Sequence, residues 1–467
     1  MSENKKYDLI VIGSGPAGEK GALTAALLGK SVALVEREPW VGGASVNTGT
    51  IPSKTLRESA LALSGLRFRD LHGVDLSVRR EATIGDLMYH EGHVQRSARE
   101  RIWESLQLND IHVFRGDGSF TGPHTVCVER EQGGPVTLEG DFVLIATGSS
   151  PVHPPGFAFE DERIHDSDEI LNLVRLPRSM AVVGAGVIGS EYACTFAALG
   201  VQVHVIDGRD ALLPFLDREL SEALLAGMKR LGIVFHWKEQ VTRCSLEEPE
   251  LVLVECASGF HMRFEGVLVA AGRKSNTESL NLAAAGITPG PKGIIQVDEA
   301  FATSVAHIMA AGDVIGFPAL AATSAEQARY AVARAFREPG AAAMAPLLPT
   351  GIYTIPELSA LGETEESLQK KGVDYVAGRA SYAANSRGEI IGERTGFLKL
   401  LFRREDMRLL GVHIIGEQAT ELIHIGQMAM LAEGGADLFD RACFNVPTLS
   451  DLYKLATAQA LQKRAAA

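Results

Sequence analysis

Two stretches of the chain share one pattern of hydrophobic and polar positions. Each begins with a short apolar run, passes through a glycine-rich turn into a helix of small apolar residues, and ends in a second apolar run closed by an acid. The first stretch spans residues 7–36 and the second spans residues 180–207. Short, continuous apolar runs between turn signals are typical of parallel strands that are buried on both faces. Both stretches therefore predict a strand, a turn, a helix and a second strand.

Each turn in these stretches carries three glycines with the spacing GxGxxG. The first glycine permits a tight turn, the second lets the backbone approach a pyrophosphate, and the third allows the helix to pack closely. The helix N-terminus offers N–H groups to phosphates, and the closing acid accepts hydrogen bonds from ribose hydroxyls. A constant offset relates the two sets, which predicts two dinucleotide sites, one for a bound flavin and one for an exchangeable nicotinamide. The residues are Gly13, Gly15, Gly18 and Glu36, then Gly184, Gly186, Gly189 and Asp207.

The remaining patterns divide the chain into three units. A strand that ends at Thr147 and Gly148 is followed by a proline-rich crossover, and a similar strand within 264–276 leads back to the first unit. Residues 337–351 are rich in Pro, Gly and Ala, which predicts a linker. The last quarter of the chain alternates apolar strands with helix, as an α+β domain does. We predict an FAD-binding domain in two parts, an NAD(P)-binding domain inserted in it, and a C-terminal domain, over 1–150 and 273–345, 151–272, and 346–467, respectively.

The bulk composition of the 467 residues narrows the function classes. A formal charge of -13 argues against a general affinity for nucleic acid or an anionic membrane. No apolar run is long enough to span a bilayer and the N-terminus lacks the features of a signal peptide, so we expect a cytoplasmic protein. The 5 cysteines stand singly, which predicts neither a zinc site nor a local redox disulfide. His90 and His93 lie one helical turn apart in a charged stretch, so we interpret them as solvated residues and expect no metal.

Further motifs give the chain a family resemblance. Residues 42–54 read GGASVNTGTIPSK, and the chain also contains GSGPAG, ATGSSP, GAGVIGSEYA, AAGRKSN, AGDV and NVPTLSDLYKLA. Over essentially the whole chain these motifs resemble the pyridine nucleotide-disulfide oxidoreductases, flavoproteins that include dihydrolipoamide dehydrogenase and glutathione reductase. Within that family, GTIPSK, VIDGRDALLPFLDREL and AGDVIGFPALAATSAEQAR look most like the soluble pyridine nucleotide transhydrogenases. The resemblance implies an α/β fold with two Rossmann-like dinucleotide-binding domains, for FAD and NAD(P)H, plus a C-terminal α+β dimerisation domain, and hence a homodimer.

The resemblance also implies a role for individual residues. The catalytic pair would be Lys54 and Glu191, joined as an ion pair beside flavin N5; without the resemblance both would be ordinary helix residues. Asp313 would hydrogen-bond the ribityl chain of FAD. The FAD residues would be Gly13, Gly15, Gly18, Glu36, Lys54, Gly118, Thr147, Gly148, Asp313 and Ala321. The NAD(P) residues would be Gly184, Gly186, Gly189, Glu191, Asp207, Arg209 and Gly272.

The chain departs from the family's disulfide reductases at the parts that handle thiols. Ser45 and Thr50 stand where those enzymes carry a cysteine pair, and a hydroxyl cannot form a disulfide. Val446 stands where a histidine serves as acid and base, with Asp451 at the position of the supporting acid, and valine cannot carry a proton. The transhydrogenases also lack this histidine and have threonine at the second cysteine position, but they keep the first cysteine, so Ser45 differs from them too.

These features favour a hydride shuttle that uses only the nicotinamide face of the flavin. We expect ping-pong transfer between NADH and NADP+, in which one nucleotide reduces FAD and leaves before a second one takes the hydride. A quinone or dye reductase, or an NADH oxidase, is an alternative, because a reduced flavin can donate to many acceptors. A non-catalytic flavoprotein that senses nucleotide is a third interpretation, but binding alone would not need both Lys54 and Glu191.

The nucleotide preference of the second site depends on charge. The Asp207 carboxylate favours two free ribose hydroxyls and repels a 2′-phosphate, by about 1 kcal/mol per charge pair at roughly 4 Å in water. Arg209 could offset this repulsion by pairing with the phosphate. We therefore expect NADH to be preferred and NADPH to bind more weakly.

Overall fold

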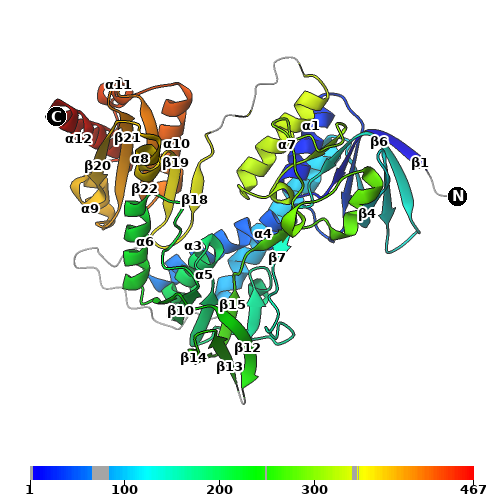
Figure 1. Ribbon diagram of the computed structural model, residues 1–467, viewed down its shortest axis with the longest axis horizontal. Helices are drawn as coiled ribbons and strands as arrows, with labels where there is room; N and C mark the ends of the chain where they lie inside the picture. Colours follow the sequence, from blue (N-terminus) through cyan, green and yellow to red (C-terminus); the bar gives the residue numbers. More distant parts are fainter. Residues whose placement is uncertain (1–3, 66–83, 248–249, 339–343, 345–346, 467) are drawn as a thin grey trace.

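The computed structural model describes residues 4–65, 84–247, 250–338, 344 and 347–466, and it arranges them as three units (Figure 1). The predicted linker lies partly outside these residues. Two units contain parallel strands with helices and the third is α+β, so the predicted fold class is confirmed. Among the described helices, none is long and apolar enough to cross a bilayer.

The first unit is built on a seven-stranded sheet with the order β3-β2-β1-β6-β5-β4, in which β17 also pairs with β6. β1, β2, β3, β6 and β17 run parallel, while β4 and β5 continue the sheet antiparallel. Helices α1 and α7 lie side by side (Figure 1). Small buried residues such as Ala22, Ala25 and Ala328 let both helices pack closely. The bounds are β1 (Asn4–Ile12), α1 (Pro16–Leu27), β2 (Val32–Glu36), β3 (His112–Arg115), β4 (Asp117–Gly122), β5 (Thr125–Glu129), β6 (Val136–Ile145), β17 (Ile308–Ala310) and α7 (Ala321–Ala335).

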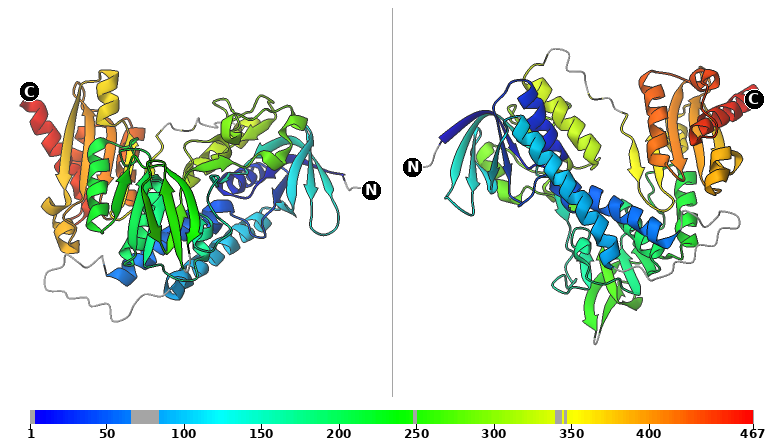
Figure 2. Two further views of the ribbon diagram at one scale, coloured as in Figure 1. Left: turned by 60° about the horizontal axis from the view of Figure 1, so that its bottom comes forward. Right: turned by 180° about the vertical axis from the view of Figure 1, so that it is seen from behind.

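Three helices between β2 and β3 carry a contact of the first unit with the second. They are α2 (Gly43–Asn47), α3 (Thr50–Ser64) and α4 (Ile84–Leu108). Asn47 at the end of α2 is fixed to α4, because Gln95 donates to its carbonyl at 2.9 Å and Arg99 donates to its side chain at 2.6 Å. The long helix α4 runs along α3 (Figure 2), and α3 in turn packs on α5 of the second unit.

The second unit contains a parallel five-stranded sheet with the order β11-β10-β9-β15-β8. A three-stranded antiparallel sheet, β12-β13-β14, shares a core with it. The chain enters through β7 and leaves through β16, and these two strands pair antiparallel. The bounds are β7 (Ser149–Pro151), β8 (Ile164–Asp166), β9 (Ser179–Val183), α5 (Val187–Ala198), β10 (Gln202–Asp207), α6 (Arg218–Arg230), β11 (Val234–Trp237), β12 (Val241–Glu247), β13 (Leu251–Cys256), β14 (His261–Phe264), β15 (Gly266–Val269) and β16 (Arg273–Ser275).

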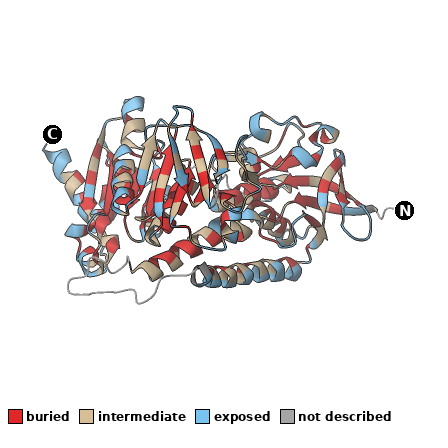
Figure 3. Ribbon diagram, turned by 90° about the horizontal axis from the view of Figure 1, so that it is seen from below, coloured by how far each residue is buried: buried red, intermediate tan, exposed pale blue. Residues whose placement is uncertain are grey.

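The third unit is an antiparallel sheet with the order β18-β19-β22-β21-β20. Helices α10 and α12 pack against its strands. Buried residues concentrate along the strands of the larger sheets (Figure 3). The bounds are β18 (Thr350–Ile352), β19 (Leu358–Gly362), α8 (Glu365–Lys371), β20 (Tyr375–Ser381), α9 (Ser386–Ile391), β21 (Phe397–Arg403), β22 (Leu409–Ile415), α10 (Ala419–Leu431), α11 (Ala436–Arg441) and α12 (Leu452–Ala465).

Candidate functional site

The first glycine-rich turn joins β1 to α1. Gly13 has a φ of +100°, and a Cβ there would lie 2.4 Å from Ala146 O, so only glycine fits. A Cβ on Gly18 would lie 1.8 Å from Gly13 O, which shows how closely the helix packs on the turn. Gly15 is different, because a Cβ there would meet only Gly43 Cα, at 3.8 Å. Packing therefore explains the first and third glycines, and the second borders open space.

The second turn, between β9 and α5, repeats this arrangement. Gly184 has a φ of +108° and a Cβ there would lie 2.5 Å from Ala270 O, while one on Gly189 would lie 2.0 Å from Gly184 O. At Gly186 a Cβ would meet no atom of the described chain within 4 Å. The middle glycine again borders space that the described protein does not fill.

The helices that follow both turns begin with N–H groups that no side chain caps. α1 begins after Gly15 and α5 begins after Gly186, and a glycine at the N-cap has no side chain that could cap these N–H groups. Free N–H groups at a helix N-terminus attract phosphate, and a glycine without a Cβ lets it approach. The residues at both turns therefore fit the pyrophosphate of a dinucleotide.

Substitutions at two glycines of the second turn are expected to differ in effect. Gly186→Ala should leave stability unchanged, since the space is open, but weaken NADH binding about tenfold because the methyl group occupies room for the pyrophosphate. Gly184→Ala should lower the free energy of unfolding by about 1–3 kcal/mol, because alanine is strained at this φ. Urea unfolding and NADH titration measure the two effects, and normal NADH affinity of Gly186→Ala would contradict this assignment.

Glu36, which closes the first turn, is anchored to the turn itself. Its Oε2 accepts hydrogen bonds from the Ser14 N–H at 2.9 Å and from the Ser14 hydroxyl at 2.5 Å. Its Oε1 accepts from the Glu38 N–H at 2.8 Å. The Ser14 hydroxyl also accepts a hydrogen bond from the Gly42 N–H, so the turn, the acid and the entry to α2 form one network. The sequence analysis did not predict Ser14, since a serine among glycines in a turn carries no distinctive signal.

Asp207, which closes the second turn, accepts the two backbone hydrogen bonds that correspond to those of Glu36, and it also binds an arginine side chain. It accepts hydrogen bonds from the Ala185 N–H at 2.6 Å and from the Arg209 N–H at 2.8 Å. The Arg209 guanidinium also binds both carboxylate oxygens, with Nε at 2.9 Å and Nη2 at 2.7 Å. Burial raises the pKa of Asp207, but the hydrogen bonds from Arg209 and Ala185 outweigh it and leave the pKa below its usual value. Arg209 therefore faces the carboxylate of its own turn in this structure.

The structure brings Lys54 and Glu191 together, although α3 and α5 belong to different units. Lys54 Nζ lies 2.7 Å from Glu191 Oε2. The Glu191 side chain is 9% exposed, whereas the Lys54 side chain is 26% exposed. Because Glu191 lies two residues after Gly189, the ion pair is placed next to the second glycine turn.

A third residue, Tyr353, completes this arrangement from just beyond β18. Its backbone N–H donates to Glu191 Oε1 at 2.9 Å. Its ring lies under the Lys54 ammonium, with 5.2 Å between Nζ and the ring centroid. The sequence analysis did not find Tyr353, because a backbone N–H and a ring face at a distant position leave no motif.

The other predicted FAD residues lie where the two dinucleotide units join. The Thr147 hydroxyl donates to Asn276 O at 2.7 Å, and the Asn276 side chain donates back to Thr147 O at 3.0 Å. Gly148 has a φ of +68°. Asp313 accepts a hydrogen bond from the Ser149 hydroxyl at 2.8 Å. These contacts hold the outgoing and returning chain segments side by side.

Three further predicted residues have different surroundings. Gly118 lies on β4, where a Cβ would come within 3.1 Å of Val35 Cγ1, so sheet packing alone explains this glycine. Ala321 begins α7. Gly272 follows β15 with a φ of +110° and no neighbour within 4 Å of a Cβ among the described residues. Their roles toward FAD and NAD(P) stay predictions.

At the positions where the family's disulfide reductases carry two cysteines and a histidine, this chain has hydroxyl and apolar side chains. Ser45 lies on α2 and Thr50 begins α3, and their hydroxyls make no hydrogen bond with any part of the chain that the structure describes. Val446 is 74% exposed, and Asp451 immediately precedes α12. The five cysteines are all free. No described group of histidine, cysteine and acidic residues could hold a metal, and His90 and His93 are exposed on α4.

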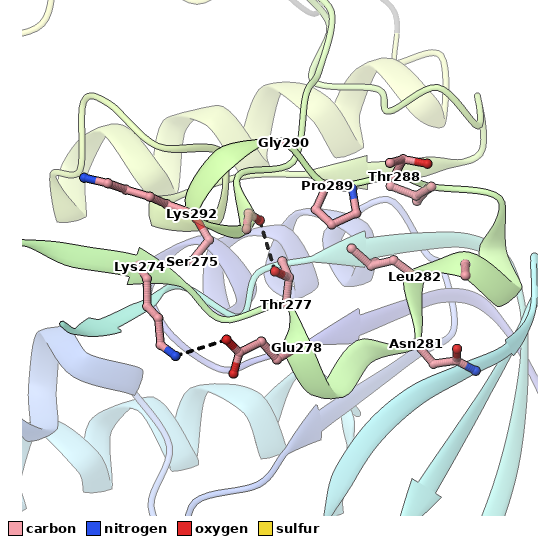
Figure 4. Close-up of a pocket in the computed structure, with 13 residues that line it drawn as sticks. Lys274, Ser275, Thr277, Glu278, Asn281, Leu282, Thr288, Pro289, Gly290 and Lys292 are labelled. Atoms are coloured by element: carbon pink, nitrogen blue, oxygen red, sulfur yellow. Dashed lines mark hydrogen bonds and ion pairs between the residues drawn. The ribbon is translucent and has the colours of Figure 1, made fainter. Parts of the chain in front are cut away.

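A surface pocket follows β16 on the first unit (Figure 4). Two of its polar side chains pair with each other, with Lys274 Nζ 3.1 Å from Glu278, and the Thr277 hydroxyl donates to the backbone Gly293 O at 3.1 Å. The pocket lining includes none of the predicted site residues. We therefore place the candidate site at the Lys54–Glu191 pair and the two turns.

Comparison with known proteins agrees with this geometry. Residues 7–334 match the family described as pyridine nucleotide-disulphide oxidoreductase, and residues 348–457 match its dimerisation domain. A soluble pyridine nucleotide transhydrogenase from Mycobacterium tuberculosis is 46% identical over 463 residues, which cover 98% of each chain. Another from Colwellia psychrerythraea is 38% identical and covers 99% of this chain and 100% of its own.

Solved structures show the same architecture. LpdA from Mycobacterium tuberculosis superposes with a TM-score of 0.90 at 26% identity, covering 97% of this chain and 99% of that one. The HOCl-induced flavoprotein disulfide reductase RclA from Escherichia coli gives a TM-score of 0.87 at 26% identity and the same coverage. With two dinucleotide turns, a cross-unit ion pair and full-length matches, the chain belongs to the pyridine nucleotide-disulphide oxidoreductase family, whose members use FAD and NAD(P)H.

Proposed function

We propose that the protein is a cytoplasmic, homodimeric transhydrogenase that transfers hydride between NADH and NADP+ with the help of FAD. The observation that carries this proposal is the ion pair of 2.7 Å between Lys54 and Glu191, which joins the FAD-side and nicotinamide-side helices. Ser45, Thr50 and Val446 support it, because these side chains cannot replace a dithiol and its histidine. Full-length relatives named soluble pyridine nucleotide transhydrogenase also support it.

Each part of the site would have a separate task. FAD, when bound, would accept a hydride from one nicotinamide nucleotide and give it to another. The N–H groups at the start of α1 and Glu36 would hold its ADP half, and those at the start of α5 would hold the pyrophosphate of the exchanging nucleotide. Lys54 would supply a fixed positive charge near the reacting rings, and Glu191 would orient that charge.

Two further observations support the proposed state and location of the protein. The C-terminal unit carries the family's dimerisation domain over residues 348–457. All five cysteines are free, as is usual for proteins of a reducing compartment. We therefore expect a homodimer in gel filtration combined with light scattering.

Anaerobic stopped-flow tests the proposed reaction. We expect NADH to bleach the bound flavin and added thio-NADP+ to restore its colour while thio-NADPH forms, because no thiol step is needed between the two nucleotides. The experiment contains no disulfide and no quinone. If NADH bleaches the flavin but only a quinone restores it, the protein is a quinone reductase and the proposal is wrong.

A further inference from the structure

We propose that Tyr353 is a positioning residue that holds Lys54 against Glu191 and thereby sets the rate of flavin reduction, an inference that rests on the proposed function. Tyr353 lies in the third unit, so the inference assigns part of the reaction's precision to a segment outside both dinucleotide units. Its contacts with the two residues of the ion pair are of different kinds. The backbone N–H binds Glu191, and the ring face meets Lys54.

The first step concerns Glu191. One carboxylate oxygen accepts from Lys54 and the other accepts from the Tyr353 N–H, so the carboxylate is held from two sides. A buried carboxylate with both oxygens bound keeps one orientation, because rotation would leave a charged oxygen without a partner. Glu191 is therefore a fixed point against which Lys54 is placed.

The second step concerns Lys54, which is the more exposed partner. A lysine side chain has a flexible four-carbon stem, and a single ion pair restrains only its end. Lys54 Nζ also donates to the Ser53 hydroxyl at 3.2 Å, and the Tyr353 ring adds a further restraint, since an aromatic face within about 6 Å attracts an ammonium group. The ring also occupies space that the lysine would otherwise sample.

The third step concerns what holds Tyr353. The residues after it bind the same faces of α3 and α5 that carry the ion pair. On α3, Arg57 Nε donates to Thr354 O at 3.0 Å and Arg57 Nη2 lies 3.2 Å from Glu357. On α5, Cys194 Sγ donates to Ile355 O at 3.8 Å.

Through these contacts the segment 353–357 binds both helices. Arg57 lies three residues after Lys54, and Cys194 lies three residues after Glu191, so each is a helical neighbour of one partner. Arg57 is 5% exposed, and its contacts with the segment 353–357 are therefore shielded from water. The docking of the third unit and the geometry of the ion pair are thus coupled.

A double-mutant cycle on the FAD-loaded enzyme tests this inference. Tyr353→Leu removes the ring face but keeps the backbone N–H, and Tyr353→Phe removes only the hydroxyl. We expect Tyr353→Leu to lower the limiting rate constant of flavin reduction by NADH about fivefold to tenfold, with the NADH Kd within about twofold of the parent. Tyr353→Phe should lower the rate constant less than Tyr353→Leu does, because it keeps the ring face. In a Lys54→Met background, Tyr353→Leu should have no further effect.

Crystal structures of the same variants give a readout that does not depend on turnover. The distance of 2.7 Å from Lys54 Nζ to Glu191 Oε2 should persist in Tyr353→Phe and be lost in Tyr353→Leu. Tyr353→Met replaces the leucine variant in both measurements if the latter does not fold. An unchanged distance, or a full effect of Tyr353→Leu in the Lys54→Met background, would overturn the inference. A normal rate for Lys54→Met alone would instead contradict the proposed role of Lys54.

Discussion

Replacing Lys54 with methionine is expected to lower the rate constant for flavin reduction by NADH about 100-fold. Methionine keeps most of the side-chain volume but removes the charge that Glu191 holds in place at 2.7 Å. Preorganised charges and donors at a reacting centre typically contribute factors of about 10²–10³. Anaerobic stopped-flow at saturating NADH measures the rate constant directly.

Glu191→Gln provides the second half of this prediction. Glutamine keeps the shape and can still accept from the Tyr353 N–H, but it no longer attracts Lys54. We expect a loss of similar size, and a double variant no slower than the slower single one, because the two residues act as a unit. Lys274→Met is the matched control, since Lys274 forms an exposed ion pair with Glu278. Equal rates for Lys54→Met and Lys274→Met would exclude a catalytic role of the Lys54–Glu191 pair.

Removing the Arg209 side chain is expected to weaken NADP+ binding about 10- to 100-fold and to change NAD+ binding by less than about threefold. A hydrogen bond to a charged group contributes about 1.5–3 kcal/mol, and without Arg209 a 2′-phosphate would face Asp207 uncompensated. The NAD+ pocket should persist, because the Ala185 and Arg209 N–H groups still hold Asp207. Titration of the Arg209→Ala holoenzyme with each nucleotide tests this.

The geometry of this pair explains how one site could serve both nucleotides. Arg209 binds Asp207 with two hydrogen bonds, and the Arg209 side chain is 48% exposed whereas that of Asp207 is 8% exposed. The guanidinium is therefore accessible to a 2′-phosphate that binds beside Asp207, and the phosphate would replace the carboxylate as its partner. Asp207→Asn should narrow the difference between NADH and NADPH, and Arg209→Lys should bind NADP+ with intermediate affinity. An unchanged preference in Asp207→Asn would refute this explanation.

The sequence predicted those parts of the molecule in which local pattern dictates structure. A glycine turn between an apolar run and a helix admits few backbone paths, as the clash between a Cβ on Gly13 and Ala146 O illustrates. The parallel strands β1 and β9 could be predicted from their continuous apolar runs. The second glycine turn, which begins at Gly184, could be predicted because its glycines keep a constant offset from those of the first turn. The predicted domain boundaries rest on two strand patterns and on a linker rich in Pro, Gly and Ala, and they stay predictions.

Contacts between distant segments could not be predicted in this way. The pairing of Lys54 with Glu191 was implied only by family resemblance, since neither helix position signals its partner. Tyr353 acts through a backbone N–H and a ring face, which any tyrosine offers. The hydrogen bond from Ser14 to Glu36 and the rotamer that places Arg209 on Asp207 depend on packing that spacing does not specify.

The paired strands β7 and β16 have a bearing on how such proteins can be rebuilt. Pro151 and Arg273 face each other in this ladder, so the two joints of the inserted unit lie about 5 Å apart, one strand spacing. The sheet of the first unit does not depend on the inserted unit, because β6 precedes the insertion, β17 follows it, and the two strands pair directly. A different nicotinamide unit could therefore be spliced in at two adjacent joints, provided that it keeps the surface that packs on α3 and on the third unit.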